Sequence, residues 1–235
     1  MEVFIVHCHP EPQSFNAALT RKASAHFRAA GDRVTISDLY RMAFNPVSDR
    51  HNFTTTKDPH YYKQQMEELH ASEHRGFAAD IEAELDKLER CDLLILQFPL
   101  WWFGLPARLK GWVDRAMVMG RVYGGGRWYD AGAFRGKRAM LSLTTGGPES
   151  IYQPDGLNGD IHQILFPINH GILRFTGFDV LPPHIVWGPA NLDADARRRA
   201  LAAYEERLGM VMGQDPIAYP PLSAYDSETL RLRRK

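Results

Sequence analysis

The amino-terminal segment contains side chains that could bind a metal or an anion. His7, Cys8 and His9 are followed by a short proline-rich stretch and then by Ser14, directly before a segment with helical periodicity. A serine at this position caps a helix, and the free N–H groups of a helix start that follows a parallel strand bind phosphate. The loop has no glycine-rich nucleotide motif, so it supports a capped helix without a ligand equally well. Adjacent residues of a strand face opposite sides, so Cys8 points away from the two histidines that flank it, and a ligand set needs more members; we therefore expect no metal site.

Three consecutive aromatic residues follow a second predicted strand. Trp101, Trp102 and Phe103 stand between Pro99 and Pro106, where a core strand normally continues into a polar turn. A rigid aromatic surface at the end of a parallel strand suits a flat ring as ligand. From composition alone, these residues are equally compatible with a contact between two subunits.

A glycine pair with neighbouring hydroxyls follows a third predicted strand. Thr144, Thr145, Gly146 and Gly147 precede Tyr152. Paired glycines allow backbone amides to approach a ligand closely, and threonine hydroxyls add uncharged donors that suit a polar heterocycle. Taken alone, the pair is better explained as a structural turn in which the glycines adopt positive φ.

Predicted strands and helices alternate along the chain. The strands are residues 3–6, 33–37, 92–98, 138–144 and 178–187, and the helices are residues 16–30, 78–90, 105–119, 160–175 and 193–212. This alternation predicts an α/β fold, a doubly wound five-stranded parallel sheet with helices on both faces. The loops after the strands then meet at one edge of the sheet. An anion site, an aromatic wall and an amide-rich rim at that edge together describe a flavin nucleotide site.

Length and composition favour one catalytic domain. The 235 residues include 28 Lys+Arg and 28 Asp+Glu, for a formal net charge of +0, and 44% of the residues are hydrophobic. The neutral balance gives no reason to expect nucleic acid or an anionic membrane as a partner. We expect a domain over residues 1–214 with a long surface segment at 44–77, and an extended carboxyl-terminal tail over 215–235 that ends in basic residues.

Cysteine content and hydropathy bear on the location of the protein. Cys8 and Cys91 lie in or beside apolar segments, which is typical of free thiols in a reducing compartment. Residues 1–6 lack the basic and long apolar regions of a secretory signal. The apolar stretch at 93–109 is interrupted by glutamine, proline and arginine, so we expect no integral membrane segment and a cytoplasmic protein.

Longer motifs carry a specific family resemblance. They are His9 with Ser14, Phe15 and Asn16, residues 37–40 with 44–46, residues 97–104 with 109–112, residues 143–147, residues 171–173 with 175 and 177–178, and residues 194–197. These motifs resemble those of the NAD(P)H:quinone oxidoreductases of the DT-diaphorase type, in the flavodoxin-like superfamily. The resemblance runs from about Phe4 to about Leu208, keeps the order of the motifs and includes every expected loop.

The resemblance implies a flavodoxin-like FAD enzyme. In this family NAD(P)H reduces the flavin and leaves, and a quinone then occupies the same pocket and accepts a hydride in a ping-pong reaction. The family's pocket is completed across a homodimer, which would bring Tyr123, Trp128 and Phe175 over the flavin beside Trp102 and Phe103. The residues implied to bind the flavin are His9, Gln13, Ser14, Phe15, Asn16, Pro99, Leu100, Trp101, Trp102, Phe103, Thr144, Thr145, Gly146, Gly147, Tyr152, Arg197 and Leu201.

The expected catalytic groups lie near the pyrimidine edge of the flavin, where negative charge develops. We expect the Tyr152 hydroxyl and the amides of Gly146 and Gly147 to stabilise that charge. Asn158 stands where the animal enzymes have a histidine, so it cannot titrate and either orients Tyr152 or caps the following helix. A second pocket tyrosine is replaced within residues 123–128, and the long carboxyl-terminal domain of some members is missing. The preference between NADH and NADPH therefore does not carry over.

The leading interpretation is an FAD-dependent NAD(P)H:quinone oxidoreductase that acts on quinones or related aromatic acceptors, with FMN as the less favoured cofactor. One alternative is an FMN-dependent azo- or nitroreductase. Another is a flavin-binding ancillary subunit of a potassium-efflux system, a role that some relatives in the superfamily have. A flavodoxin-like electron carrier is least favoured, because such carriers are smaller and acidic.

Overall fold

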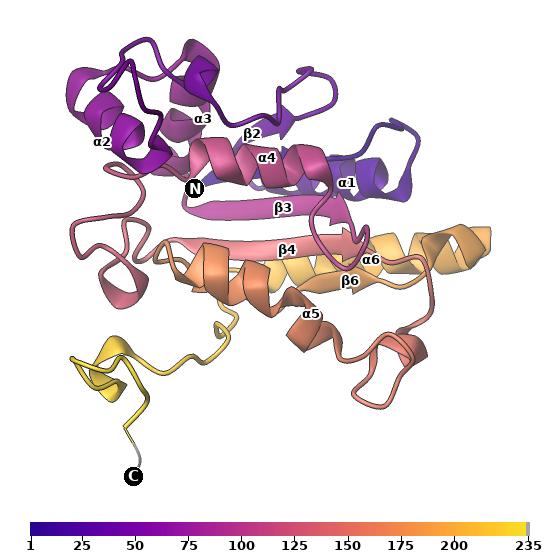
Figure 1. The fold of residues 1–235 in the computed structure, drawn as a ribbon. Helices are drawn as coiled ribbons and strands as arrows, with labels where there is room; N and C mark the ends of the chain where they lie inside the picture. The colour runs from indigo at the N-terminus through magenta and orange to yellow at the C-terminus, as the bar shows by residue number, and fades with distance from the viewer. Residues whose placement is uncertain (234–235) are drawn as a thin grey trace.

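One parallel sheet forms the centre of the molecule. The computed structural model describes residues 1–233. The strands are β1 (Glu2–His7), β2 (Arg33–Asp38), β3 (Leu93–Pro99), β4 (Arg138–Thr144), β5 (Asp179–Val180) and β6 (His184–Val186). Their order is β2-β1-β3-β4-β5, and β6 also pairs with β4 (Figure 1). Every pairing is parallel, so the doubly wound, five-strand-wide sheet expected from the sequence is confirmed.

The last strand of the sheet differs from the prediction. The sequence predicts a single strand over residues 178–187, but β5 pairs with the beginning of β4 and β6 pairs with its end. Pro182 and Pro183 lie between the two pieces. Proline has no N–H to donate to a ladder and its φ is fixed, so the strand is interrupted there.

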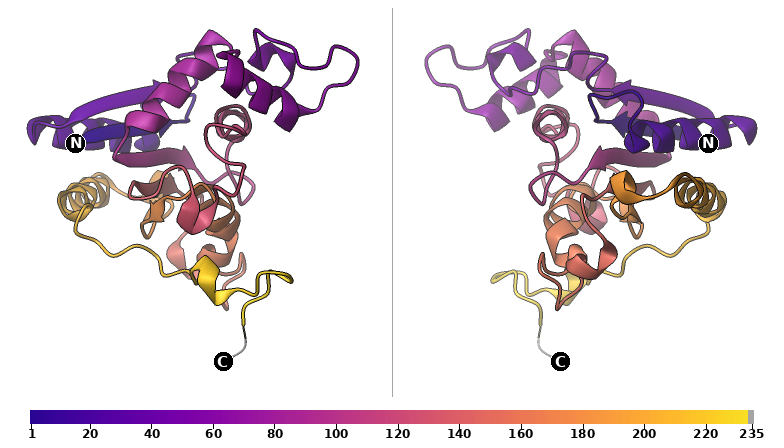
Figure 2. Two further views of the ribbon diagram at one scale, coloured as in Figure 1. Left: turned by 90° about the vertical axis from the view of Figure 1, so that its left-hand side faces the viewer. Right: turned by 90° about the vertical axis from the view of Figure 1, so that its right-hand side faces the viewer.

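Helices cover both faces of the sheet (Figure 2). The helices are α1 (Phe15–Ala29) and α6 (Ala194–Met210) on one face, and α3 (Ala79–Arg90), α4 (Ala107–Ala116) and α5 (Ile161–Ile168) on the other. The side chains of β1 alternate between the two layers. Val3 and Ile5 join the core that includes α1 and α6, whereas Phe4 and Val6 join the core of the opposite face. Burial on both faces explains why the strands are almost continuously apolar.

The helix predicted over residues 160–175 consists of two parts. Asp160 caps α5, and its carboxylate accepts a hydrogen bond of 2.8 Å from the N–H of His162. Pro167 lies inside α5, and from Asn169 to Arg174 the chain continues as a π-helix. The cap is Asp160, so of the two alternatives for Asn158 the one in which it caps this helix is wrong.

The long segment at 44–77 contains a helix that the sequence does not predict. This helix, α2 (Gln64–His74), lies beside α3 and α4 (Figure 1). Gln64 Nε2 donates to the carbonyl of Asp114 on α4 at 3.2 Å. Arg115 of α4 also holds the segment, because its Nε donates to Asn52 Oδ1 at 2.6 Å. The segment therefore lies over the surface of the domain.

The carboxyl-terminal tail follows α6, runs back along the domain and then extends away from the domain (Figure 2). Arg138 of β4 donates to the carbonyl of Gln214 at 2.6 Å, and the N–H of Ile217 donates to the carbonyl of Val180 at 2.7 Å. A short 3-10 turn follows at Leu222–Ala224. The basic end predicted for the tail is described as far as Arg233, and residues 234–235 lie outside the described residues.

Two groups of loops lie at opposite ends of the sheet (Figure 1). The loops that follow β1, β3 and β4 are at the carboxyl ends of these strands. Residues 117–137, which precede β4, and residues 169–178, which precede β5, are at the amino ends. The first group carries most of the predicted cofactor residues, and the second carries Tyr123, Trp128 and Phe175.

Candidate functional site

A cavity of 620 Å³ lies at the carboxyl ends of the strands. Its size is within the range of roughly 300–1,000 Å³ that is typical of ligand sites. Ala18, Pro189 and Ala190 line part of it, and sequence analysis missed these three because small and apolar residues carry no chemical signal. The predicted cofactor residues that line it are His9, Gln13, Ser14, Phe15, Asn16, Pro99, Leu100, Trp101, Thr144, Thr145, Gly146, Arg197 and Leu201.

The beginning of α1 offers backbone donors to this cavity. Ser14 caps the helix, and its Oγ accepts a hydrogen bond of 3.1 Å from the N–H of Ala17. The N–H groups of Phe15 and Asn16 belong to the first helical turn and have no acceptor within the helix. Both residues line the cavity, so these two amides and the positive end of the helix dipole are available to an anionic group.

Asn16 connects the helix start with the ends of two strands. Its Nδ2 donates to Thr144 Oγ1 at 2.8 Å, and its Oδ1 accepts from Gln97 Nε2 at 2.8 Å. All three side chains are buried. Gln97 Oε1 is buried and has no hydrogen-bond partner among residues 1–233. A buried oxygen of this kind is normally satisfied by an ordered water or another bound group.

Gly146 forms an open part of the rim. Neither Gly146 nor Gly147 has a positive φ, so the explanation of the pair as a positive-φ turn is wrong. A Cβ atom at Gly147 would lie 2.6 Å from Ile151 Cδ1, but one at Gly146 would meet nothing within 4 Å. The fold itself therefore does not require glycine at 146. The open space fits a ligand that approaches the backbone closely.

The hydroxyls of both threonines are engaged within the chain. Thr144 Oγ1 accepts from Asn16, and Thr145 Oγ1 donates to the carbonyl of Gly147 at 2.8 Å. Thr145 Oγ1 also accepts from the N–H of Gly188 at 3.3 Å. The expectation of two free hydroxyl donors is therefore wrong for Thr145, whose proton closes the turn. The rim therefore keeps the backbone amides and the Thr144 hydroxyl, which only accepts from Asn16, as donors.

The aromatic run forms a tight turn with an unusual backbone. The N–H of Gly104 donates to the carbonyl of Trp101 at 3.0 Å, and the two residues between them have positive φ, 50° at Trp102 and 59° at Phe103. Such a conformation costs a bulky residue roughly 1–2 kcal/mol, and strain of this kind clusters at functional sites. Trp101 lines the cavity and packs on His9, whereas Trp102 is 97% exposed and Phe103 50% exposed. Within one chain, Trp102 and Phe103 do not line the cavity.

The far end of the cavity is formed by the first turns of α6. Asp193 caps this helix and accepts a hydrogen bond of 2.7 Å from the N–H of Ala196. The Arg197 guanidinium donates to the carbonyls of Pro189 at 3.0 Å and Ala190 at 3.1 Å. Arg197 thus holds the preceding turn against the helix and shapes the cavity with it.

Tyr152 lies in a neighbouring cavity of 510 Å³. The ring is buried and packs on Trp187, with ring centroids 5.5 Å apart. His184 and Arg207 line the same cavity, and burial together with the positive charge of Arg207 lowers the pKa of His184 to about 4. Tyr152 therefore does not line the cavity that Gly146 lines. Asn158 is half-buried, and its N–H donates to the carbonyl of Ile151 at 2.8 Å.

The aromatic residues expected over the flavin gather at the other end of the sheet. The rings of Tyr123 and Phe175 have centroids 5.8 Å apart. Trp128 and Phe175 line a third cavity, of 740 Å³, together with tail residues that include Leu222 and Leu230. One chain therefore does not bring these residues to the cavity at the carboxyl ends of the strands.

The His7 to His9 segment is used mainly in packing. His7 Nδ1 lies 2.8 Å from Thr20 Oγ1, and burial lowers the pKa of His7. Cys8 is fully buried, which raises the pKa of its thiol to about 12. In the part of the chain from 1 to 233, no three His, Cys, Asp or Glu side chains are grouped as metal ligands would be. No helix in that part combines the length and the hydropathy of a membrane span.

Comparisons with known proteins agree with this geometry. Residues 1–208 match the family model for the flavodoxin-like fold. The chain is 42% identical to rat NAD(P)H dehydrogenase [quinone] 1 over 223 residues, 94% of this chain and 81% of the relative. It is 40% identical to human ribosyldihydronicotinamide dehydrogenase [quinone] over 217 residues, 92% of this chain and 94% of the relative. A crystal structure from Klebsiella pneumoniae, assigned as a quinone reductase, has a TM-score of 0.96 at 39% identity and covers 99% of this chain and 94% of its own.

The sheet order and the position of the cavity define a protein of the flavodoxin-like superfamily. Within it, the chain belongs to the family of NAD(P)H:quinone oxidoreductases of the DT-diaphorase type. The family expectation from the sequence motifs is therefore confirmed, and the protein is an oxidoreductase of the NAD(P)H dehydrogenase (quinone) class.

Proposed function

We propose that the protein is an FAD-dependent NAD(P)H:quinone oxidoreductase. The observation that carries the proposal is the single cavity that extends from Trp101 past the start of α1 to Arg197 on α6. FMN ends at its phosphate, so it would leave the Arg197 end unfilled, whereas the adenosine half of FAD would occupy it. The names of the rat and human relatives support NAD(P)H as the donor and a quinone as the acceptor.

The residues of the cavity have separable roles in this proposal. The amides of Phe15 and Asn16 bind the diphosphate, and Trp101 packs against the ring. The amides of Gly146 and Gly147 lie at the pyrimidine edge, where fixed donors stabilise negative charge without reorganisation. The bound flavin supplies the capacity to accept a hydride from NAD(P)H and to deliver it to a quinone. Asn158 has no titratable group, so its role is limited to orienting Tyr152 or an acceptor oxygen.

The proposal includes a homodimer with two shared sites. Tyr123, Trp128 and Phe175 precede β4 and β5, at the end of the sheet opposite the cavity, so they reach a cavity only in another copy. Trp102 is 97% exposed in one chain, which is unusual for so large an aromatic side chain. In a two-fold assembly each copy covers the exposed aromatic turn of the other.

The first test identifies the cofactor. Flavin released from the purified protein by acid is separated and identified by mass spectrometry, and FAD is the expected result. FMN in its place would contradict the role of Arg197 at the adenine end.

The buried free thiols Cys8 and Cys91 support a reducing compartment, and we propose a cytoplasmic enzyme.

The second test is steady-state kinetics with a soluble quinone. One slot over the flavin cannot hold nicotinamide and quinone together, so double-reciprocal lines at several quinone concentrations should be parallel. Intersecting lines would show a ternary complex and contradict the ping-pong scheme. Azo and nitro compounds in the same assay test the reductase alternative. Bound flavin without turnover of any acceptor would favour the ancillary subunit.

A further inference from the structure

We propose that Glu68 and Gln65 of α2 are positioning residues that fix Tyr123 and so set the width of the acceptor pocket. The inference rests on the proposed function, in which Tyr123 of one copy covers the cavity of the other. Neither Glu68 nor Gln65 would touch the flavin or the acceptor. They act through the loop at residues 117–128, which is the first part of the connection from α4 to β4 and carries Tyr123 and Trp128.

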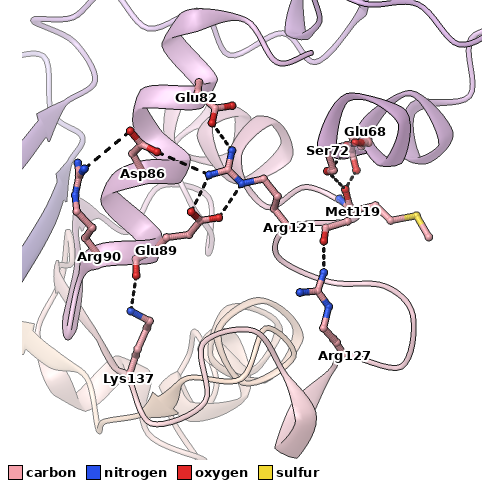
Figure 3. A network of polar contacts seen from close by, with 11 residues as sticks. Glu68, Ser72, Glu82, Asp86, Glu89, Arg90, Met119, Arg121, Arg127 and Lys137 are labelled. Atoms are coloured by element: carbon pink, nitrogen blue, oxygen red, sulfur yellow. Dashed lines mark hydrogen bonds and ion pairs between the residues drawn. The ribbon is translucent and has the colours of Figure 1, made fainter. Parts of the chain in front are cut away.

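One attachment of this loop is to α3 (Figure 3). Arg121 donates from Nε to Glu89 Oε1 at 2.7 Å and from Nη2 to Glu89 Oε2 at 2.8 Å. It also pairs with Glu82. These bonds hold the middle of the loop, but they do not reach the Tyr123 side chain.

The other attachment is to α2 (Figure 3). The N–H of Met119 donates to Glu68 Oε2 at 2.7 Å, and the carbonyl of Met119 accepts from Ser72 Oγ at 2.9 Å. The N–H of Gly120 donates to the carbonyl of Tyr123 at 2.8 Å, which closes a turn over residues 120–123. The segment at 44–77 therefore fixes the loop through its helix.

The Tyr123 hydroxyl meets the same helix. It accepts from Gln65 Nε2 at 3.3 Å and donates to Glu68 Oε2 at 3.5 Å. Glu68 Oε2 thus contacts both Met119, which precedes the closed turn, and Tyr123, its last residue. The backbone after Tyr123 is less restrained. Residues 124–126 are glycines with positive φ, and a Cβ at Gly125 or Gly126 would meet nothing within 4 Å.

Glu68 differs from Glu67 in its partners, and the difference supports its role in fixing Tyr123. Both Glu67 and Glu68 are 2% exposed. Glu67 pairs with Arg50, but within residues 1–233 no cation lies within 4.0 Å of the Glu68 carboxylate. Burial without a cation raises the pKa of Glu68. A buried carboxyl without a counter-charge destabilises a fold unless its hydrogen bonds compensate, and those of Glu68 go to the loop and to Gln64.

The direct test observes the Tyr123 hydroxyl in the intact protein. With tyrosines labelled at Cζ, the NMR signal that Tyr123→Phe removes is assigned to Tyr123. Glu68→Ala should shift this signal, and Glu68→Gln should restore most of it because the amide oxygen still accepts. Glu67→Ala is the matched control, since it removes an equally buried carboxyl that does not touch Tyr123, and should leave the signal in place. Equal shifts in the two alanine variants would overturn the proposal.

The functional readout is the quinone KM in the flavin-loaded enzyme. Glu68→Ala should change the KM for a bulky quinone about three- to tenfold, the scale of one ordinary hydrogen bond lost, with a smaller change in kcat. In a Tyr123→Phe background, the same substitution should have a smaller effect on KM, because of the bonds from the loop to Glu68 only that from Met119 is then left to lose. If Glu68→Ala does not fold, Gln65→Ala, which alters an exposed side chain, should shift the NMR signal and the KM in the same directions.

The outcomes separate this inference from the function on which it rests. A parent protein that binds no flavin or reduces no quinone contradicts the proposed function, whatever the NMR signal does. An active parent in which Glu68→Ala and Gln65→Ala leave both the Tyr123 signal and the KM unchanged contradicts the positioning role alone.

Discussion

Asn16 and Thr144 are joined by a buried hydrogen bond of 2.8 Å, although 128 positions separate them in the chain. The bond connects the first turn of α1 with the end of β4, two elements that border the cavity. Gln97 extends it to β3 through Asn16 Oδ1. The Asn16 side chain therefore holds the start of α1 in a fixed position relative to the ends of β3 and β4.

Asn16→Ala should lower both stability and flavin affinity. The substitution leaves Thr144 Oγ1 and Gln97 Nε2 buried without partners, which costs about 1–3 kcal/mol in the free energy of unfolding. Urea unfolding of the flavin-free protein measures this loss. In a cycle with Thr144→Val the two effects should not add, because both variants break the same bond. Strict additivity would show that the bond contributes nothing.

Gly146→Ala should affect the ligand rather than the fold. A Cβ at this position meets nothing within 4 Å and φ is not positive, so the unfolding midpoint of the flavin-free protein should stay the same. The added methyl occupies the open side of the rim, and flavin should bind about tenfold more weakly or worse, as measured by fluorescence quenching. Gly171→Ala, which also has open space and lies outside the cavity, is the control and should change neither quantity. Unchanged flavin affinity in Gly146→Ala would contradict the placement of the ring.

Trp102→Asn should separate stability from activity. The side chain is 97% exposed and φ is 50°, a conformation that asparagine tolerates better than tryptophan. In the dissociated, flavin-free single chain, the free energy of unfolding should therefore stay constant or rise by up to about 1 kcal/mol. Quinone turnover should fall at least about tenfold, because the pocket loses an aromatic wall. A variant that is strongly destabilised but turns over at the parent rate would contradict both statements.

His184 should make the protein less stable in mild acid. Its pKa is about 4 in the folded protein and 6.5 when unperturbed, so above pH 6.5 the ring is neutral in both states and the stability is fully present. As the pH falls from 6.5 to 4, only the unfolded chain takes up this proton, and stability decreases by about 3 kcal/mol in total. His184→Gln should remove this part of the pH dependence in urea titrations at several pH values. An identical slope in the variant would mean that His184 titrates normally.

The sequence predicts the frame of the molecule because burial on both faces leaves apolar runs that are easy to recognise. The break between β5 and β6 is caused by Pro182 and Pro183, which cannot donate to a ladder. The β-formers on either side nevertheless predict a single strand. The helix α2 is not predicted, because it buries Glu67 and Glu68 and so has little apolar periodicity. Its polar buried side chains are satisfied by distant segments, and a local pattern does not reveal such partners.

The candidate site is predictable to the extent that it is built from loops after strands. His9, Ser14, Trp101, Gly146 and Arg197 line one cavity, as the order of elements predicts. The placement of individual side chains depends on tertiary contacts instead. Tyr152 packs against Trp187 and lines another cavity, and a hydrogen bond within the turn occupies the Thr145 hydroxyl.

Subunit complementation tests the shared site most directly. One parent carries Gly146→Val, which blocks the flavin side, and the other carries Trp128→Ala with Phe175→Ala, which removes the distant aromatic side. Each variant should be inactive alone. When the two variants are unfolded together and refolded as a random equimolar mixture, about half of the dimers are mixed, and each mixed dimer has one intact site of two. Turnover should therefore reach roughly a quarter of the rate of the unmodified enzyme. A mixture that remains as inactive as its components would contradict a site formed by the cavity of one copy and the aromatic cluster of the other.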